Sequence, residues 1–535
     1  MSKWRFFGPT PKIIIFIFAL VILLELIVLA MRIASVWGQG ALTGTTGMEG
    51  VVVYPIWKVI HGFPLYEWPF RFPFSSTPYN FLFFYSYALP LRFLGNAQAD
   101  ILLYGKFLTF AYAVVGVMLQ YHLCRILIPH VRDTKARAVL AGVAILTWFG
   151  TGFTSWWALS VRPDLPGTVL SLLGFLTAIK SLDTNRRFWM VIASILFFLA
   201  WGFKQSIIGF STGLGLYLIY RGRWSDVIAL SVPFAILSAI TFLIGGEVYR
   251  YNIVEFTFDL RTRGLLLIAQ RLLLVVLGPN FFTWSIGVVG LIAFYYLGGR
   301  HHHEHVDPKN PPMGYFRHRT LIFVTLAVNA ILGLAAFSYL GSSRNQFFQS
   351  YLLAATLTSL ILAMAVSAKP TRATRAVLAM AVIFLAFTGV VPALQIAFPN
   401  RYGTQRSYAA DVFDARLRFR DYLQTLSKPI FVDDDTFALP WIVNEERYPA
   451  FPLDDIYYVE AKTKGIVEEG GFEDLIKRGC FGTLLLPESN SWVPIAVDAQ
   501  YIEESLEPLW SKALEAKEPW VRLVRNAPRD PSCQF

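Results

Sequence analysis

Charged residues are scarce in this sequence. Asp, Glu, Lys and Arg together make up 16% of its 535 residues, whereas hydrophobic residues make up 55%, and the mean hydropathy is +0.49. A soluble domain of this composition would expose much of its apolar surface to water, so the scarcity of charge excludes a soluble fold. The sequence therefore predicts an α-helical protein that crosses a membrane many times.

Acidic residues are fewer than basic ones, and internal repeats are missing. The net charge is +11, but Lys and Arg are scattered among short segments between apolar runs rather than gathered on one face. This distribution predicts contact with anionic membrane lipids and no nucleic-acid partner. Because inspection finds no repeat, a transporter built from repeated halves is disfavoured.

Eleven apolar runs are long enough for a helix that crosses a bilayer, which needs about 20 residues. They are 13–35, 99–121, 138–156, 164–182, 188–203, 205–220, 226–247, 279–298, 320–340, 346–368 and 375–396. Two shorter apolar stretches, 80–95 and 264–278, adjoin long polar segments. We expect both to lie in the outer membrane interface or to dip into it.

The segments between these runs alternate between rich and poor in Lys and Arg. The set that begins with residues 1–12 carries nearly twice as many of these residues as the other set, although the other set is longer. By the positive-inside rule, the N-terminus is expected in the cytoplasm and the C-terminus outside. The first apolar run is too long for a cleaved signal peptide and is expected to anchor the chain.

Two charged residues fall inside the predicted crossings. Glu25 would lie well below the outer membrane boundary, and Lys106 in the next crossing would lie at a similar depth. A carboxylate at that depth must be paired or protonated. We expect a structural Glu25–Lys106 ion pair between packed helices, with a proton or substrate site as the alternative.

The composition changes after residue 397, where the long apolar runs stop. Residues 1–397 are therefore assigned to a membrane domain, and residues 398–535 to a small extracytoplasmic α/β domain. In the second domain the patterns predict strands at 429–432, 481–486 and 520–524, and helices at 472–479 and 503–516.

Cysteine is rare as well, with three residues in the chain. Cys124 lies at the cytoplasmic end of a predicted crossing, whereas Cys480 and Cys533 fall in the predicted outer domain, where oxidising conditions permit a disulfide bond. Such a bond would close a loop of about 50 residues and contribute a few kcal/mol by the chain-entropy argument. Two separate buried thiols are the alternative, because a sequence does not give the distance between them.

The long segment after the first crossing carries the first candidate for chemistry. Glu49 lies between Gly47 and Gly50 and precedes an apolar stretch that predicts a helix lying on the membrane. Glycine neighbours let the backbone approach a ligand closely. A carboxylate held at the surface beside apolar residues suits the role of a general base. A solvated loop glutamate is the alternative.

Short motifs follow one another along the first half of the chain. They are Glu49–Gly50 after the first crossing, Gly62 with Pro64, Leu65 and Tyr66, then Pro78–Tyr79 opening an aromatic helix that ends in Arg92–Gly95, and finally Val161–Asp164 (VRPD) and Phe203–Ser206 (FKQS). In their order and their common side of the membrane, they resemble the GT-C glycosyltransferases of the protein-mannosyltransferase and aminoarabinose-transferase type. The resemblance covers residues 10–220, and the C-terminal domain matches in architecture only.

The resemblance implies an enzyme of the bacterial inner (plasma) membrane. It would transfer a sugar from a polyprenyl-phosphate carrier to a glycan, lipid or protein acceptor on the outer face, with inversion at the anomeric carbon. This reaction needs a base for the acceptor's proton and cations for the departing phosphate. Glu49 is the expected base, and Asp164 is expected to orient Arg162 or to bind the sugar. The residues expected to bind the donor, chiefly its phosphate, are Arg162, Asp164, Lys204, Gln205, Arg71 and Arg344. For the cations, contact with lipid head groups is the alternative.

The sequence departs from the family pattern in one place. Many members carry an acidic pair in the first loop, whereas Met48 precedes Glu49 here. Either Glu49 serves alone or the base lies elsewhere, and Glu255 and Asp259 are then the reserve candidates.

No metal and no cofactor are expected. His301, His302, His303, Glu304 and His305 have ligand chemistry, but they are adjacent in a Pro-rich segment on the cytoplasmic side, which predicts a solvated loop. Asp433, Asp434 and Asp435 follow a predicted strand, which favours a polar loop over a cation site. A single departing phosphate needs only two cationic side chains for neutralisation.

Two rival classes stay open. One is a transporter or flippase for lipids or lipid-linked sugars with an outer domain. The other is an oligosaccharide ligase or polymerase that uses diphosphate donors, which would be expected to carry several Arg and a His in a large outer loop. Segment 248–278 has four Arg but no His.

Overall fold

The computed structural model describes most of the helical part and much of the C-terminal part of the chain. The described residues are 11–39, 49–70, 77, 79–94, 101–150, 154, 156–256, 269–270, 317–337, 344–367, 410–432, 458, 462–465, 467, 470–505, 519–526, 528, 530–531 and 533. The predicted crossings 279–298 and 375–396 lie outside them, as does the boundary after residue 397. So does the stretch 264–278, apart from residues 269–270.

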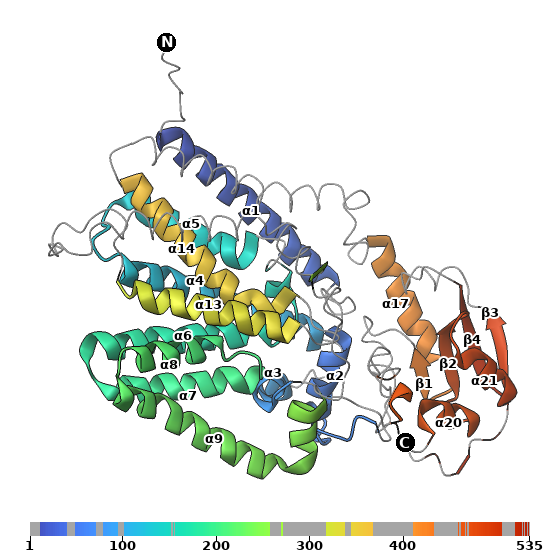
Figure 1. Ribbon diagram of the computed structural model, residues 1–535. Helices are drawn as coiled ribbons and strands as arrows, with labels where there is room; N and C mark the ends of the chain where they lie inside the picture. The colour runs from blue at the N-terminus through green and yellow to red at the C-terminus, as the bar shows by residue number, and fades with distance from the viewer. Residues whose placement is uncertain are drawn as a thin grey trace.

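The fold is mostly helical, as the composition predicts. Six of the described helices are long and apolar enough to cross a membrane. They are α1 (Pro11–Gln39), α4 (Ile101–Leu127), α6 (Asp164–Thr184), α9 (Trp224–Arg250), α13 (Arg319–Phe337) and α14 (Phe348–Ser367). Figure 1 shows them gathered in one body, with the C-terminal sheet beside it.

Three further predicted crossings form shorter helices. They are α5 (Thr134–Ile145), which continues into the π-helix η1 (Leu146–Gly150), α7 (Arg187–Phe203) and α8 (Gly209–Tyr220). All three are shorter than the about 20 residues that a full crossing needs, so these crossings are not confirmed. For α8 the reason is local: the chain leaves the helix at Lys204 and makes a turn before Gly209.

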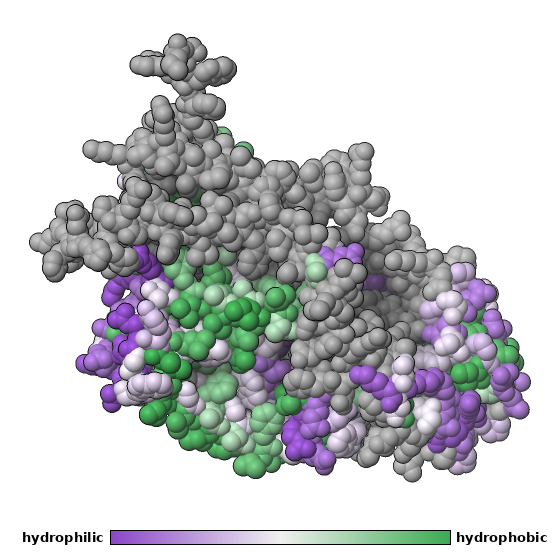
Figure 2. Space-filling view, viewed as in Figure 1, coloured by the Kyte–Doolittle hydropathy of each residue, from purple (hydrophilic) through white to green (hydrophobic). Residues whose placement is uncertain are grey.

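The outer face of α9 shows what surrounds the helical part. Leu243 and Ile244 are more than 80% exposed, and Ile228 and Ile236 are largely exposed. Figure 2 shows apolar colour spread over this side of the helical body and polar colour over much of the C-terminal part. Such a continuous apolar surface suits lipid rather than water.

Helices α6 and α7 form a tight hairpin. Asn185 ends α6 in the left-handed conformation at φ 53°, a conformation that Asn adopts more readily than most residues. Helix α7 then starts at Arg187 and runs back along α6. The start of α6 and the end of α7 are therefore brought to the same end of the hairpin.

Two short helices follow the first crossing. The apolar stretch after Glu49 forms α2 (Glu49–Ile60), and the stretch 80–95 forms α3 (Phe81–Leu94). The first of these, predicted to lie on the membrane surface, packs its apolar side chains against protein. Val53, Trp57 and Phe83 are fully or almost fully buried in one apolar cluster shared by the two helices, because aromatic residues of α3 cover α2.

The C-terminal part contains a small mixed sheet with the order β1-β2-β4-β3. Strands β1 (Ile430–Val432) and β2 (Thr483–Pro487) are parallel, while β4 (Trp520–Arg525) runs antiparallel to both β2 and β3 (Tyr501–Ser505). Helices α17 (Ala410–Gln424), α20 (Gly471–Lys477) and α21 (Trp492–Asp498) accompany it. Figure 1 shows this unit at the right of the helical body.

Most of the predicted elements of this part are present. Strands β1, β2 and β4 and helix α20 match the predictions, but the helix predicted at 503–516 is wrong at its start. Residues 503–505 belong to β3, because pairing with β4 satisfies their backbone groups, for example at Glu504 opposite Arg522. The rest of that segment lies outside the described residues. Cys480 and Cys533 form a disulfide bond with Cα atoms 5.4 Å apart.

Candidate functional site

The hairpin of α6 and α7 places two predicted site residues in contact. Asp164 opens α6 and Lys204 directly follows α7, and Lys204 Nζ lies 2.6 Å from Asp164 Oδ1. A helix dipole favours a carboxylate at the N-terminus and a cation at the C-terminus. The dipole of α6 therefore stabilises Asp164, and the dipole of α7 stabilises Lys204. Both side chains are buried, so the pair is shielded from water and salt.

Asp164 has further capacity for hydrogen bonds. Its Oδ1 also accepts a bond from Asn345 Nδ2 at 2.9 Å, and Asn345 lies in the short 3-10 helix η4 (Arg344–Phe347). The other oxygen, Oδ2, is buried and has no hydrogen-bond partner among the described residues. Since a buried carboxylate oxygen normally accepts a bond, Oδ2 is suited to a hydroxyl of a bound ligand. That Asp164 orients Arg162 or binds the sugar stays a prediction, alongside its observed pairing with Lys204.

Aromatic side chains surround the two cations. Arg162 Nη1 donates to Tyr79 Oη at 3.3 Å, and its guanidinium lies 5.2 Å from the ring centre of Trp157. The ammonium of Lys204 lies 5.6 Å from the ring centre of Tyr79. Tyr79 therefore contacts both cations, through its hydroxyl and through its ring, in an arrangement that stabilises positive charge.

Glu49 is joined to the same segment of chain. It opens α2, is completely buried, and accepts a hydrogen bond from the backbone N–H of Val161 at 2.5 Å. Val161 immediately precedes Arg162 and packs closely on α4, where a Cβ on Gly105 would lie 2.8 Å from its side chain. Glu49 is therefore not a solvated loop residue, and its carboxylate belongs to the interior of the site.

Lys106, which follows Gly105, is also completely buried and lies within electrostatic range of Glu49. The predicted Glu25–Lys106 pair is therefore wrong. The cation that interacts electrostatically with Glu25 is Arg32, on the same helix. Neither carboxylate oxygen of Glu25 has a hydrogen-bond partner among the described residues. Glu25 instead packs against Gly150 in η1, where an added Cβ would lie 3.3 Å from its carboxyl carbon. Arg416 of α17, also buried, lies within electrostatic range of Lys106.

The remaining predicted residues are placed only in part. Gln205 follows Lys204 in the turn before α8 and is half-buried. Arg344 begins η4, but its side chain lies outside the described side chains, and Arg71 lies outside the described residues altogether. The side chain of the reserve base Glu255 is exposed and forms an ion pair with Arg250 at 2.9 Å. Outside the described residues lie Asp259, the segment His301–His305 and Asp433–Asp435.

Three residues of the site were not singled out by charge or motif as ligands. Asn345 and Trp157 are uncharged and belong to no motif. Tyr79 was named only as part of the Pro78–Tyr79 motif. A signal was present for Tyr79 in its aromatic surroundings, but only the fold brings it to Arg162 and Lys204. Among the described residues, no group of three or more His, Cys, Asp and Glu is arranged to hold a metal ion.

Comparison with known proteins gives a structural likeness only. No protein-family model matches the chain, and the search of curated proteins returns no significant match. Two similar solved structures are crystal structures of ArnT from Cupriavidus metallidurans, one in the apo state and one bound to undecaprenyl phosphate. Each shares 13% sequence identity and covers 94% of this chain and 97% of its own, at TM-scores of 0.48 and 0.49. Because both TM-scores lie below 0.5, the function proposed below is argued from the contacts of the site.

Proposed function

We propose that this protein is a membrane glycosyltransferase that moves a sugar from a polyprenyl-phosphate-linked donor to a hydroxyl or amine acceptor on the extracytoplasmic face. The observation that carries the proposal is the joining of a buried carboxylate, Glu49, to two cations, Arg162 and Lys204, through one short segment of chain. Such a transfer requires at least a general base and a group that binds the departing phosphate.

Each reacting group has a side chain of suitable chemistry. Glu49 takes the proton of the acceptor as the acceptor atom bonds to the anomeric carbon of the sugar. The bond from that carbon to the phosphate oxygen breaks, and its electron pair leaves with the polyprenyl phosphate. Arg162 and Lys204 stabilise the charge that develops on the phosphate. Attack from the face opposite the leaving group inverts the anomeric carbon.

Asp164 has two roles in this scheme. Through Oδ1 it holds the ammonium of Lys204, and through Oδ2 it accepts a hydrogen bond from a hydroxyl of the sugar. The cations are sufficient for a single phosphate, so the reaction requires no metal and no cofactor. The acceptor is a glycan, a lipid or a protein.

The lipid part of the donor fits the surroundings of the site. Asp164 and Lys106 lie on α6 and α4, which are long enough to span a membrane, and the apolar surface of α9 suits contact with acyl chains. We assign the protein to an inner membrane, as the resemblance to GT-C glycosyltransferases implies. From the distribution of Lys and Arg, we place the N-terminus in the cytoplasm and the C-terminal domain (398–535) outside.

The test is a transfer assay with the purified full-length protein. Radiolabelled polyprenyl-phosphate sugars are incubated with the protein and a membrane lipid extract, with and without EDTA. We expect label to move to an acceptor equally well in EDTA. Movement of the carrier across a vesicle membrane without sugar transfer would support a flippase instead, and transfer lost in EDTA would refute the metal-free mechanism.

A further inference from the structure

A second polar network lies behind the candidate site. Helix α9 bends at Gly246, whose φ of 67° with ψ of −164° is a combination that essentially only glycine adopts. The chain then continues to the π-helix η3 (Tyr251–Glu255). Asn252 lies in η3 and is completely buried. Single π-helical turns inserted in α-helices often occur at functional sites.

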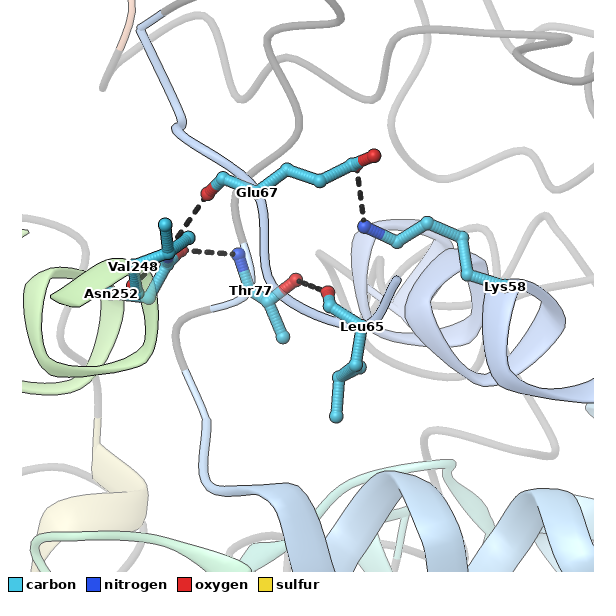
Figure 3. A network of polar contacts seen from close by, with 6 residues as sticks. All are labelled: Lys58, Leu65, Glu67, Thr77, Val248 and Asn252. Carbon is cyan, nitrogen blue, oxygen red and sulfur yellow. Dashed lines mark hydrogen bonds and ion pairs between the residues drawn. The ribbon is translucent and has the colours of Figure 1, made fainter. Parts of the chain in front are cut away.

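The amide of Asn252 joins three stretches of backbone. Its Nδ2 donates to the carbonyl oxygens of Glu67 at 2.8 Å and Val248 at 2.9 Å, and its Oδ1 accepts from the N–H of Thr77 at 3.2 Å. Figure 3 shows the side chain of Asn252 between these groups. Both donor hydrogens and the acceptor of the amide are thus used.

The same network is closed at its other end. Thr77 Oγ1 donates to the carbonyl of Leu65 at 2.9 Å, and Lys58 on α2 forms an ion pair with Glu67 at 2.9 Å (Figure 3). Burial lowers the pKa of Lys58, and the neighbouring Glu67 opposes this effect. Residues before and after the segment 68–76 are therefore held to each other and to α2.

Tyr79 is fixed on both sides by the chain that follows Gly246. Thr77, two residues before it, is bound by Asn252, and Asn80, directly after it, accepts a hydrogen bond from Tyr249 Oη at 2.5 Å. Asn80 in turn donates to the carbonyl of Trp201 at 2.7 Å, near the end of α7. Tyr79 is the residue that contacts both Arg162 and Lys204.

We propose that Asn252 is a positioning residue of the candidate site, which acts through Tyr79 by holding its phenol against Arg162 and Lys204. The inference rests on the proposed function, because Arg162 and Lys204 are there the groups that bind the donor phosphate. Loss of the Asn252 amide releases Thr77, lets Tyr79 move, and removes the support of the two cations. Phosphate affinity then falls, although Asn252 touches neither cation.

A double-mutant cycle distinguishes this role from a general structural one. Affinity for undecaprenyl phosphate is measured on the full-length protein for wild type, Asn252→Ala, Tyr79→Ala and the double variant, together with kcat and KM for transfer. We expect Asn252→Ala to weaken binding by about 10-fold, the size of one or two net hydrogen bonds, and to raise KM more than it lowers kcat. In the Tyr79→Ala background it should then have no further effect.

Two variants keep the test decisive. Asn329→Ala removes another buried amide and should leave binding unchanged, because the Nδ2 of Asn329 donates to the carbonyl oxygen of Thr325 within α13. Tyr249→Phe removes only one hydroxyl and replaces Asn252→Ala if that variant fails to fold. Its effect should likewise vanish in Tyr79→Ala.

Three results are informative. Losses that multiply in the double variant would overturn the positioning role while leaving the proposed function intact. An effect of Asn329→Ala equal to that of Asn252→Ala would also overturn it. A wild-type protein that neither binds undecaprenyl phosphate nor transfers sugar would overturn the proposed function, and the positioning role with it.

Discussion

The carboxylate of Glu49 accepts a hydrogen bond from the backbone N–H of Val161 at 2.5 Å, although 112 positions separate the two residues. This contact links the first helix after the N-terminal crossing to the segment that carries Arg162 and Asp164. A hydrogen bond from a backbone N–H fixes the position of a carboxylate without using a cationic side chain as the partner. The contact therefore brings a buried carboxylate to the stretch of chain that carries two of the other charged residues of the candidate site.

Breaking the Asp164–Lys204 pair should destabilise the protein strongly. Asp164→Asn leaves the buried ammonium of Lys204 without its counter-charge, at an expected cost of about 3–5 kcal/mol. Thermal unfolding of the protein in detergent measures the effect. The matched control is Asp183→Asn near the other end of α6, which loses a more exposed pair with Arg317 and should cost about 1 kcal/mol or less. Equal effects of the two substitutions would contradict a buried pair.

The C-terminal unit should lose stability in acid through Glu473. Burial raises the pKa of Glu473, but hydrogen bonds from Lys462, Tyr458 and Trp492 outweigh this and hold the pKa below its usual value of 4.5. A carboxyl with a lowered folded pKa contributes stability above its unfolded pKa and loses it as the pH falls through the folded value. Hydrogen exchange of residues 471–505 between pH 6 and pH 3 should show this loss.

Glu473→Gln serves as the comparison for that experiment. The variant should be less protected at pH 6 and should change less as the pH falls, because its side chain does not titrate. If the wild type and the variant lose protection in parallel, other carboxyl groups control the acid response and the prediction is wrong.

The Cys480–Cys533 bond should contribute about 4 kcal/mol to the C-terminal unit, as the chain-entropy argument gives for a separation of 53 residues. Reductant should therefore lower the unfolding temperature of the wild type and leave the Cys480→Ala, Cys533→Ala double variant unaffected. Cys124→Ser, which changes a buried free thiol, should respond to reductant as the wild type does. An unchanged wild type would show that the bond does not contribute to stability.

The sequence allowed much of the helical fold to be predicted, because long apolar runs have few alternatives to a helix in a membrane. The start of α6 at Asp164 and the end of α7 before Lys204 were both close to the predicted bounds. Pairing was harder to predict. Lys106 was assigned to Glu25 by depth alone, whereas in the fold Glu25 packs against Gly150 and Lys106 lies within electrostatic range of Glu49.

Among the residues that the structure brings together in the candidate site, the sequence had singled out only the charged ones. Glu49, Arg162, Asp164 and Lys204 stand out as charges beside apolar runs, so a sequence reveals them. Asn345 and Asn252 carry no charge, and their value comes from the exact direction of an amide, which depends on tertiary contacts over long sequence separations. Burial of Glu49 was also missed, because the aromatic residues that cover α2 come from α3.

Removal of the Glu49 carboxylate tests the central claim most directly. Sugar transfer and undecaprenyl phosphate binding are measured side by side for wild type, Glu49→Gln and Glu255→Gln, an exposed and ion-paired glutamate. The account predicts that Glu49→Gln lowers transfer by about 10²–10⁴-fold, as expected for a lost general base, and keeps phosphate binding, while Glu255→Gln matches the wild type. Full transfer by Glu49→Gln would contradict the account.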